Sequence, residues 1–270
     1  MDTIGYFEEG GVRMRLEPAR EECFRVVRHD TEMYEYGGTD LVARREAIHR
    51  HMSNEMTSLD IAAQCVADFP DAPWPLRMEL ARQCWDESRH VVALYRRLLD
   101  LGGKKGEFPI SAFEWCVTCA IDNLPGRLAS QNRTFEAGAM DVVGDHIVNW
   151  RAVGDGATAD ILDAILADEI QHVRFANRWI RTMADDDPRV LMKIAMAVRF
   201  TERANGVLRA KGGEVTPVGT EFAPAEQRTP KVNIDDRKLA GFSDEEIHEI
   251  LRQAGFRTLI RETAASDATV

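Results

Sequence analysis

The chain has 270 residues, of which 44% are hydrophobic, and a formal net charge of −11 at pH 7. This length allows one large domain or two small ones, and the acidic balance argues against a general nucleic-acid-binding surface. The sequence has no run of 18 apolar residues typical of a transmembrane helix, and its first residues do not resemble a secretory signal. We therefore expect a cytoplasmic protein that does not associate with membranes.

The first predicted elements are a short strand and two long helices. Residues 1–38 have no strong period and form an N-terminal arm, in which Val12–Leu16 alternates like a strand. Apolar residues then recur at helical spacing from Thr39 to Asp68, until a Phe-Pro-Asp-Ala-Pro segment breaks the helix. The second helix begins near Trp74, where the next residue is a proline that suits a first turn, and ends at a Gly-Gly pair.

The rest of the chain predicts three more long helical segments and a final short helix. The third segment covers residues 111–153, and Pro125 should kink or divide it. The fourth covers 157–183, and the fifth begins at Pro188 and ends near Ala204. We expect an all-α fold, namely a four-helix bundle with a fifth helix and extended terminal segments.

The C-terminal part differs in composition from the helical segments. Residues 205–240 are rich in Gly, Pro and Thr, which indicates an irregular arm, and a helix follows at 243–254. The predicted organisation is therefore an arm (1–38), a helical bundle (39–204) and a C-terminal arm with a short helix (205–270).

Five cysteines are scattered through the helical segments, which suits a reducing compartment better than a disulfide framework. Cys116 and Cys119 form a Cys-x-x-Cys pair, but a zinc ribbon or a rubredoxin-type iron site needs four sulfurs. We interpret the pair as small buried apolar residues, and redox use is the alternative.

The sequence contains two Asp-Glu-x-x-His motifs that occur at matched positions in the helical part. A lone glutamate precedes each of them, because Glu55 lies 32 residues before Glu87 and Glu136 lies 33 residues before Glu169. Two helix pairs would each supply one Glu and one Glu-x-x-His, which is the ligand set of a carboxylate-bridged dimetal centre in a helical bundle. A Glu and a His three residues apart share one helix face, so both can reach the same ion. The predicted metal ligands are Glu55, Glu87, His90, Glu136, Glu169 and His172, with Glu87 and Glu169 as the bridging and catalytic residues.

A bare Glu-x-x-His is a weak signal, because two other copies have a simpler explanation. Glu46 and His49 lie on the same helix as Glu55, but Glu46 would be about 13 Å from it at 1.5 Å per residue. Glu245 and His248 follow Ser243, and this segment matches a capping box at the first turn of a helix. We assign no metal role to either pair.

Three further residues are candidates for interactions with the ligands. A ligand histidine commonly donates its second N–H to a carboxylate, and Asp86 and Asp168 precede the two glutamates of the motifs. His51 lies one turn before Glu55 and either supports the site or is an ordinary polar residue at the edge of the core. Arg89 should pair with a carboxylate, and the tryptophans Trp115, Trp150 and Trp179 should serve in packing.

The motifs resemble those of the ferritin-like superfamily of dimetal-carboxylate proteins. Asp86–His90 is similar to the D-E-x-R-H signature of bacterial multicomponent monooxygenases and acyl-carrier-protein desaturases, and Asp168–His172 has Gln171 in place of the arginine. The stretches EMTSLD, FPDAPWP and RTFEAG resemble an uncharacterised bacterial branch of the superfamily. The resemblance covers residues 40–185 and implies the six metal ligands named above.

A dimetal site of this kind implies chemistry with O₂. The leading hypothesis is a non-haem diiron oxidase or monooxygenase that acts on a small organic substrate, with Mn/Fe or two Mn ions as alternatives and O₂ as co-substrate. An electron-donor protein and a homodimer are partners that this reading allows. The competing hypotheses are iron storage or peroxide detoxification, hydroxylation of a transfer-RNA base, and a helical scaffold without a metal.

Overall fold

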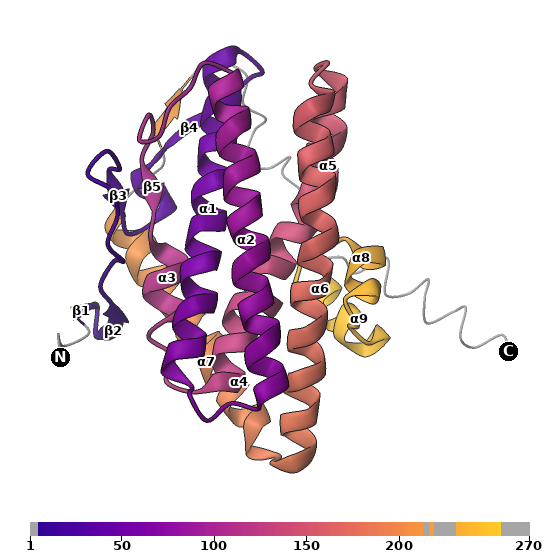
Figure 1. Cartoon of the computed structure of the whole chain (residues 1–270). Coiled ribbons are helices and arrows are strands. Elements are labelled where there is room, and N and C mark those ends of the chain that lie inside the picture. Colours follow the sequence, from indigo (N-terminus) through magenta and orange to yellow (C-terminus); the bar gives the residue numbers. More distant parts are fainter. Residues whose placement is uncertain (1–4, 213–215, 219–230, 255–270) are drawn as a thin grey trace, which may run out of the picture. The chain divides into compact units, whose positions relative to one another are not determined.

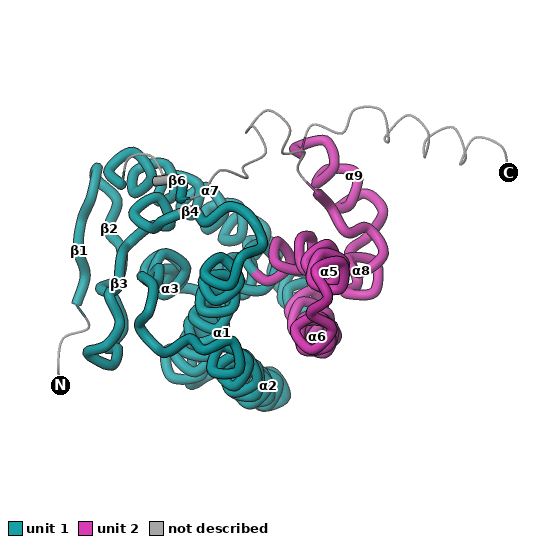
Figure 2. The backbone as a smooth tube through the Cα atoms, turned by 90° about the horizontal axis from the view of Figure 1, so that it is seen from above, with its two compact units in different colours: residues 1–135, 179–222 teal, residues 136–178, 223–270 magenta. Residues whose placement is uncertain are grey.

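The computed structural model describes residues 5–212, 216–218 and 231–254 (Figure 1). These residues are mostly helical, with several long helices and three small two-stranded sheets. The chain divides into two compact units: unit 1 comprises residues 1–135 and 179–222, and unit 2 comprises residues 136–178 and 223–270 (Figure 2). Within the described residues, every helix is too short or too polar to cross a membrane.

The first two helices of unit 1, α1 (Leu41–Asp68) and α2 (Trp74–Asp100), form a hairpin (Figure 1). Asp40 starts α1, because its side chain accepts the free N–H groups of the first turn. Gly102, with φ +75°, follows the end of α2 in a conformation that costs glycine little. The predicted extents of both helices are confirmed to within two residues.

The third predicted segment is divided into four parts. They are α3 (Phe113–Thr118), α4 (Leu124–Leu128), the π-helical segment η2 (Ala129–Glu136) and α5 (Ala137–Ala152). Pro125 lies in the first turn of α4, where its missing N–H costs nothing, so the prediction that it divides the segment is confirmed. The π-helical turn was not predicted, because nothing in the hydrophobic period distinguishes it from an α-helix.

The last two long helices are α6 (Gly156–Asp186) and α7 (Arg189–Gly212). The prediction that the fifth helix ends near Ala204 was wrong, because α7 continues to Gly212. Ala204 and Leu208 extend the buried stripe of this helix, and that burial outweighs the low helix propensity of the glycine between them.

The C-terminal region is more regular than its composition suggested. Strand β6 (Thr216–Val218) pairs with an N-terminal strand of unit 1, and α8 (Ile234–Leu239) lies within the stretch that we expected to be irregular. That expectation is therefore wrong for residues 205–212, 216–218 and 234–239, while 213–215 and 219–230 lie outside the described residues. Helix α9 (Asp244–Gln253) begins at Ser243 with the predicted capping box.

The N-terminal region contributes strands to all three sheets. The hairpin β1 (Tyr6–Glu9) and β2 (Val12–Arg15) confirms the predicted strand. β3 (Val26–Val27) pairs in parallel with β5 (Ile110–Ser111), and β4 (Tyr34–Tyr36) pairs in parallel with β6. These sheets depart from the all-α expectation, because short segments of the N-terminal arm find their strand partners far along the chain.

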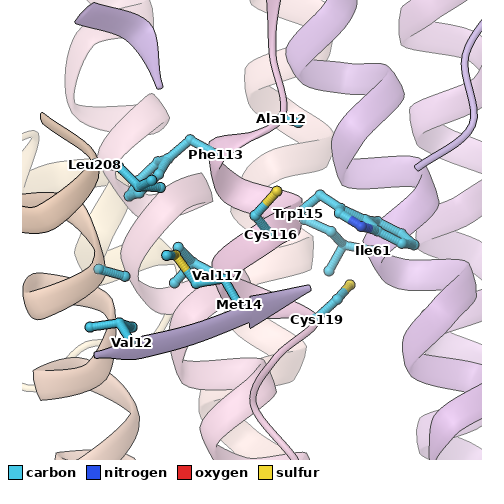
Figure 3. Close-up of a cluster of buried hydrophobic side chains, with 11 residues drawn as sticks. Val12, Met14, Ile61, Ala112, Phe113, Trp115, Cys116, Val117, Cys119 and Leu208 are labelled. Atoms are coloured by element: carbon cyan, nitrogen blue, oxygen red, sulfur yellow. The ribbon is translucent and has the colours of Figure 1, made fainter. Parts of the chain in front are cut away.

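A hydrophobic cluster joins β2, α1, α3 and α7 in unit 1 (Figure 3). Trp115 packs in it and donates its indole N–H to the carbonyl of Leu16, 2.8 Å away. Cys116 and Cys119 are also part of the cluster, and burial raises the pKa of each thiol to about 12. Because such thiols stay protonated, their interpretation as small apolar residues is supported.

Candidate metal centre

Unit 1 brings together Glu55 of α1 with Glu87 and His90 of α2. All three are at least nine-tenths buried, and their candidate ligand atoms lie within 4.8 Å of one another. His90 Nδ1 is 3.1 Å from Glu55 Oε2 and 3.2 Å from Glu87 Oε2. The i, i+3 spacing on α2 therefore places its Glu and His side by side, and the α1–α2 hairpin adds the second carboxylate.

The ionisation of Glu55 in this triad depends on two imidazoles, that of His90 and that of His51 beside the triad. Burial would raise the pKa of Glu55, but hydrogen bonds from His51 and His90 outweigh it and hold that pKa well below its usual range. His51 Nε2 lies 2.8 Å from Glu55 Oε1. His51 therefore contacts a candidate ligand, and its role in supporting a metal site stays a prediction.

Unit 2 contains a second triad of the same composition. Glu136 is the last residue of η2, and Glu169 and His172 lie on α6. The three are again at least nine-tenths buried, with candidate ligand atoms within 4.8 Å of one another. His172 Nδ1 lies 3.3 Å from Glu169 Oε2, so the same ring nitrogen faces the carboxylate in both triads.

The donor atoms of each triad suit a transition-metal ion. Buried carboxylates are costly unless they are paired or bind a metal, and each triad holds two of them against one imidazole. A set of carboxylates and imidazole favours iron, manganese or zinc, whereas magnesium and calcium prefer oxygen ligands throughout. The side chains present in each unit therefore fit a metal site.

The aspartates of the two motifs lie in different surroundings. Asp86 is buried and accepts hydrogen bonds from Arg82 Nε, at 2.8 and 2.9 Å, and from Arg89. The predicted pairing of Arg89 with a carboxylate is thus confirmed. Asp168 is half-buried. Hydrogen bonds from the ligand histidines to these two aspartates stay a prediction.

Two buried side-chain amides, which were not predicted from the sequence, form a chain of hydrogen bonds that ends at Glu87. Gln83 Nε2 donates to Glu87 Oε1 at 3.2 Å, and Asn132 Nδ2 of η2 donates to Gln83 Oε1 at the same distance. Both amide residues are 1% exposed. Gln83 lies one turn before Glu87 on the same helix face, and this spacing could have predicted its contact with Glu87. No sequence signal could have predicted the contact of Asn132, because the π-helical turn determines where its side chain points.

Replacing Gln83 with leucine tests whether this amide orients the carboxylate. The substitution keeps the volume but removes the donor to Glu87, and the loss of such a contact to a ligand typically weakens metal binding about 10–100-fold. We expect this loss in a titration with ferrous ion under anaerobic conditions. Gln64→Leu, which removes an amide bonded to Asp68 instead, should leave the affinity unchanged. Equal affinities for the two variants would show that Gln83 does not orient the ligand.

The two excluded Glu-x-x-His pairs have structural roles that need no metal. Glu46 forms an ion pair with Arg50 at 2.6 Å, and His49 Nε2 accepts a hydrogen bond from the backbone N–H of Gly106 at 3.1 Å. Glu245 lies in the first turn of α9, whose N-terminus is capped by Ser243.

His49 should make the stability of the protein depend on pH. It is completely buried beside the rings of Phe24 and Phe108, and burial lowers its pKa to about 4. As pH falls below about 6.5, the unfolded chain binds a proton that the folded chain excludes, so stability decreases until pH reaches about 4. The contribution is about 3 kcal/mol.

Denaturant unfolding of the metal-free protein between pH 7 and pH 4 measures this effect. His49→Gln keeps an acceptor for Gly106 and removes the titrating ring, so its free energy of unfolding should fall less steeply over this range. His248→Gln, on α9, should follow the original chain. Parallel curves for all three proteins would refute the assignment to His49.

Comparison with models of known protein families gives a match over most of the chain. A family model described as "Protein of unknown function (DUF455)" matches residues 6–213, which is most of the chain. No curated protein and no solved structure matches the chain.

Proposed function

The chain belongs to the DUF455 family, and we propose that it is a dimetal-carboxylate oxidoreductase that uses O₂ to oxidise a small organic substrate. The observation that carries the proposal is the presence of two buried triads of the same composition, each with two glutamates and one histidine. The ferritin-like resemblance of the two sequence motifs supports the same function.

We propose that the two triads serve one pair of metal ions. The matched spacing of 32 and 33 residues gives each helix pair the same contribution, as in dimetal-carboxylate bundles. Glu87 and Glu169 would bridge the ions, Glu55 and Glu136 would each bind one ion, and His90 and His172 would complete the set. Four carboxylates would neutralise the charge of two divalent cations, which explains why so many acids are buried.

When two ferrous ions are bound, they supply the electrons for the reduction of O₂. The residues of the chain hold and tune that site. The burial of both triads keeps water away from the proposed ligands. Gln83 donates a hydrogen bond that fixes one carboxylate oxygen of Glu87. His51 holds its Nε2 proton against Glu55 Oε1, which keeps this carboxylate charged and oriented.

Iron is the metal that we propose first, with a Mn/Fe pair or two manganese ions as alternatives that share the same ligand preference. Substrate oxidation with O₂ also requires electrons, so an electron-donor protein is a proposed partner. The cytoplasm is the proposed location.

Metal content per chain tests this proposal directly. Protein expressed with both iron and manganese available should contain about two metal ions per chain by elemental analysis. The presence of both iron and manganese would favour a heterometal site, and many iron atoms per chain would favour iron storage. If no metal binds even after anaerobic loading with ferrous ion, the proposed function is wrong.

A further inference from the structure

Helix α2 exposes a row of large apolar side chains on the face turned away from Glu87 and His90. Two of them are tryptophans, which monomeric proteins rarely leave in water unless they bind something. The exposed fractions are 68% for Trp74, 44% for Met78, 62% for Trp85, 46% for Val92 and 48% for Leu99.

The row follows a heptad repeat. Met78, Trp85, Val92 and Leu99 are seven residues apart and occupy the position usually called a. The d positions of the same repeat, four residues before each of these, are Trp74, Ala81, Ser88 and Tyr95. This set, which we call the α2 seam, extends for about 38 Å along the helix. A seam of this period matches another helix that runs along it, rather than a small ligand.

We infer that the α2 seam binds the α2 seam of a second copy of this chain, with the two helices antiparallel across a two-fold axis. A two-fold interface must be complementary to itself. An antiparallel pair meets this requirement, and one register also places large side chains against small ones at its centre, because Trp85 then faces Ser88 of the second copy and Val92 faces Ala81. The same register places Met78 against Tyr95 and Leu99 against Trp74 at the two ends. A parallel pair would instead place the two Trp85 rings against each other.

The amount of exposed apolar surface is appropriate for a stable dimer. The two tryptophans alone leave on the order of 300 Å² of ring surface in water. With the methionine, valine and leucine of the seam, each copy offers about 500 Å², and the stems of the flanking arginines add to it. A standard interface buries about 800 Å² per partner, of which somewhat more than half, or about 450 Å², is apolar.

The charges beside the seam are also compatible with self-association. One flank carries the arginines Arg82, Arg89 and Arg96 together with the acids Glu79, Asp86 and Asp100. Arg82 and Arg89 already share Asp86, so this flank has little net charge although the chain as a whole is acidic. The antiparallel arrangement also brings Arg96 of each copy toward the Glu79 end of the other.

The test is the oligomeric state of the full chain by sedimentation equilibrium between about 1 and 100 μM. The original chain should be a dimer, and Trp85→Glu should weaken self-association at least 100-fold. Val148→Glu introduces the same charge at another exposed apolar position, 64% exposed on α5, and should leave the dimer intact. Circular dichroism of each variant checks that it is folded, and Leu99→Glu replaces Trp85→Glu if that variant does not fold.

The register has its own test. Ser88→Phe should dissociate the dimer, because it fills the space that Trp85 of the second copy occupies, whereas Ser88→Ala should not. A monomeric original chain at 100 μM, or a dimer that survives Trp85→Glu, overturns the inference. A dimer that survives Ser88→Phe overturns the antiparallel register. None of these outcomes depends on whether the protein binds metal, since no candidate ligand lies in the seam.

Discussion

Replacing Glu87 with alanine should reduce the metal content from about two ions per chain to fewer than one. Glu87 is completely buried, hydrogen-bonds to His90 and receives a hydrogen bond from Gln83. As the proposed bridging ligand it would contact both ions, so its loss should affect both and abolish any O₂-dependent oxidation. Elemental analysis after anaerobic loading with ferrous ion measures the change.

Glu245→Ala is the matched control for this substitution. It removes a glutamate from a third Asp-Glu-x-x-His sequence, Asp244–His248, in the first turn of α9, and should retain both ions. If Glu87→Ala binds two ions as tightly as the control, the ligand assignment is wrong. Glu169→Ala should behave like Glu87→Ala, which makes the equivalence of the two motifs testable.

The metal-free form of Glu87→Ala should unfold less readily than the metal-free original chain. Without a metal, Glu55 and Glu87 share the imidazole of His90, and holding two carboxylates this close together in a buried site typically costs a few kcal/mol. A stability gain together with a loss of metal is expected of a functional ligand, whereas a residue that only supports the fold would lose stability.

The elements of this fold were largely predictable where local signals are strong. Helices α1 and α2 carry a capping aspartate, an early proline and a terminal glycine, and these residues define the helix ends through contacts within the same segment. The β4–β6 pairing and the extension of α7 depend on contacts between distant segments. Local composition gives no sign of such contacts, so residues 205–212, 216–218 and 234–239 were wrongly expected to be irregular.

In the candidate site, too, contacts within one helix were predictable from the sequence, and contacts that depend on irregular structure were not. Glu87 with His90, and Glu169 with His172, could be paired from sequence because the helix period alone places them side by side. The contacts of His51 and Gln83 with the ligands follow from the same period, one turn away from Glu55 and Glu87 respectively. Asn132 could not be found in this way, because a π-helical turn shifts the face on which it lies.

Removing the metal with a chelator should lower the midpoint of thermal unfolding by about 10–20 °C. A ligand that binds only the folded state at 100 times its Kd stabilises that state by about 2.7 kcal/mol, so two such sites add about 5 kcal/mol. For a chain of this size, each kcal/mol shifts the midpoint by about 2–4 °C. Each triad also buries two carboxylates, which lose their main compensation when the ion leaves.

Restoring the midpoint with different ions distinguishes a specific site from a general effect of cations. Ferrous or manganous ion should restore it, and magnesium at the same concentration should not, because magnesium prefers oxygen ligands and the triads offer an imidazole to each ion. Glu87→Ala should show a much smaller change with either treatment, since it has little metal to lose. A chain that loses two ions without any change in its midpoint would show that the buried acids are stabilised by protein contacts alone, and the two triads would then be structural networks rather than metal ligands.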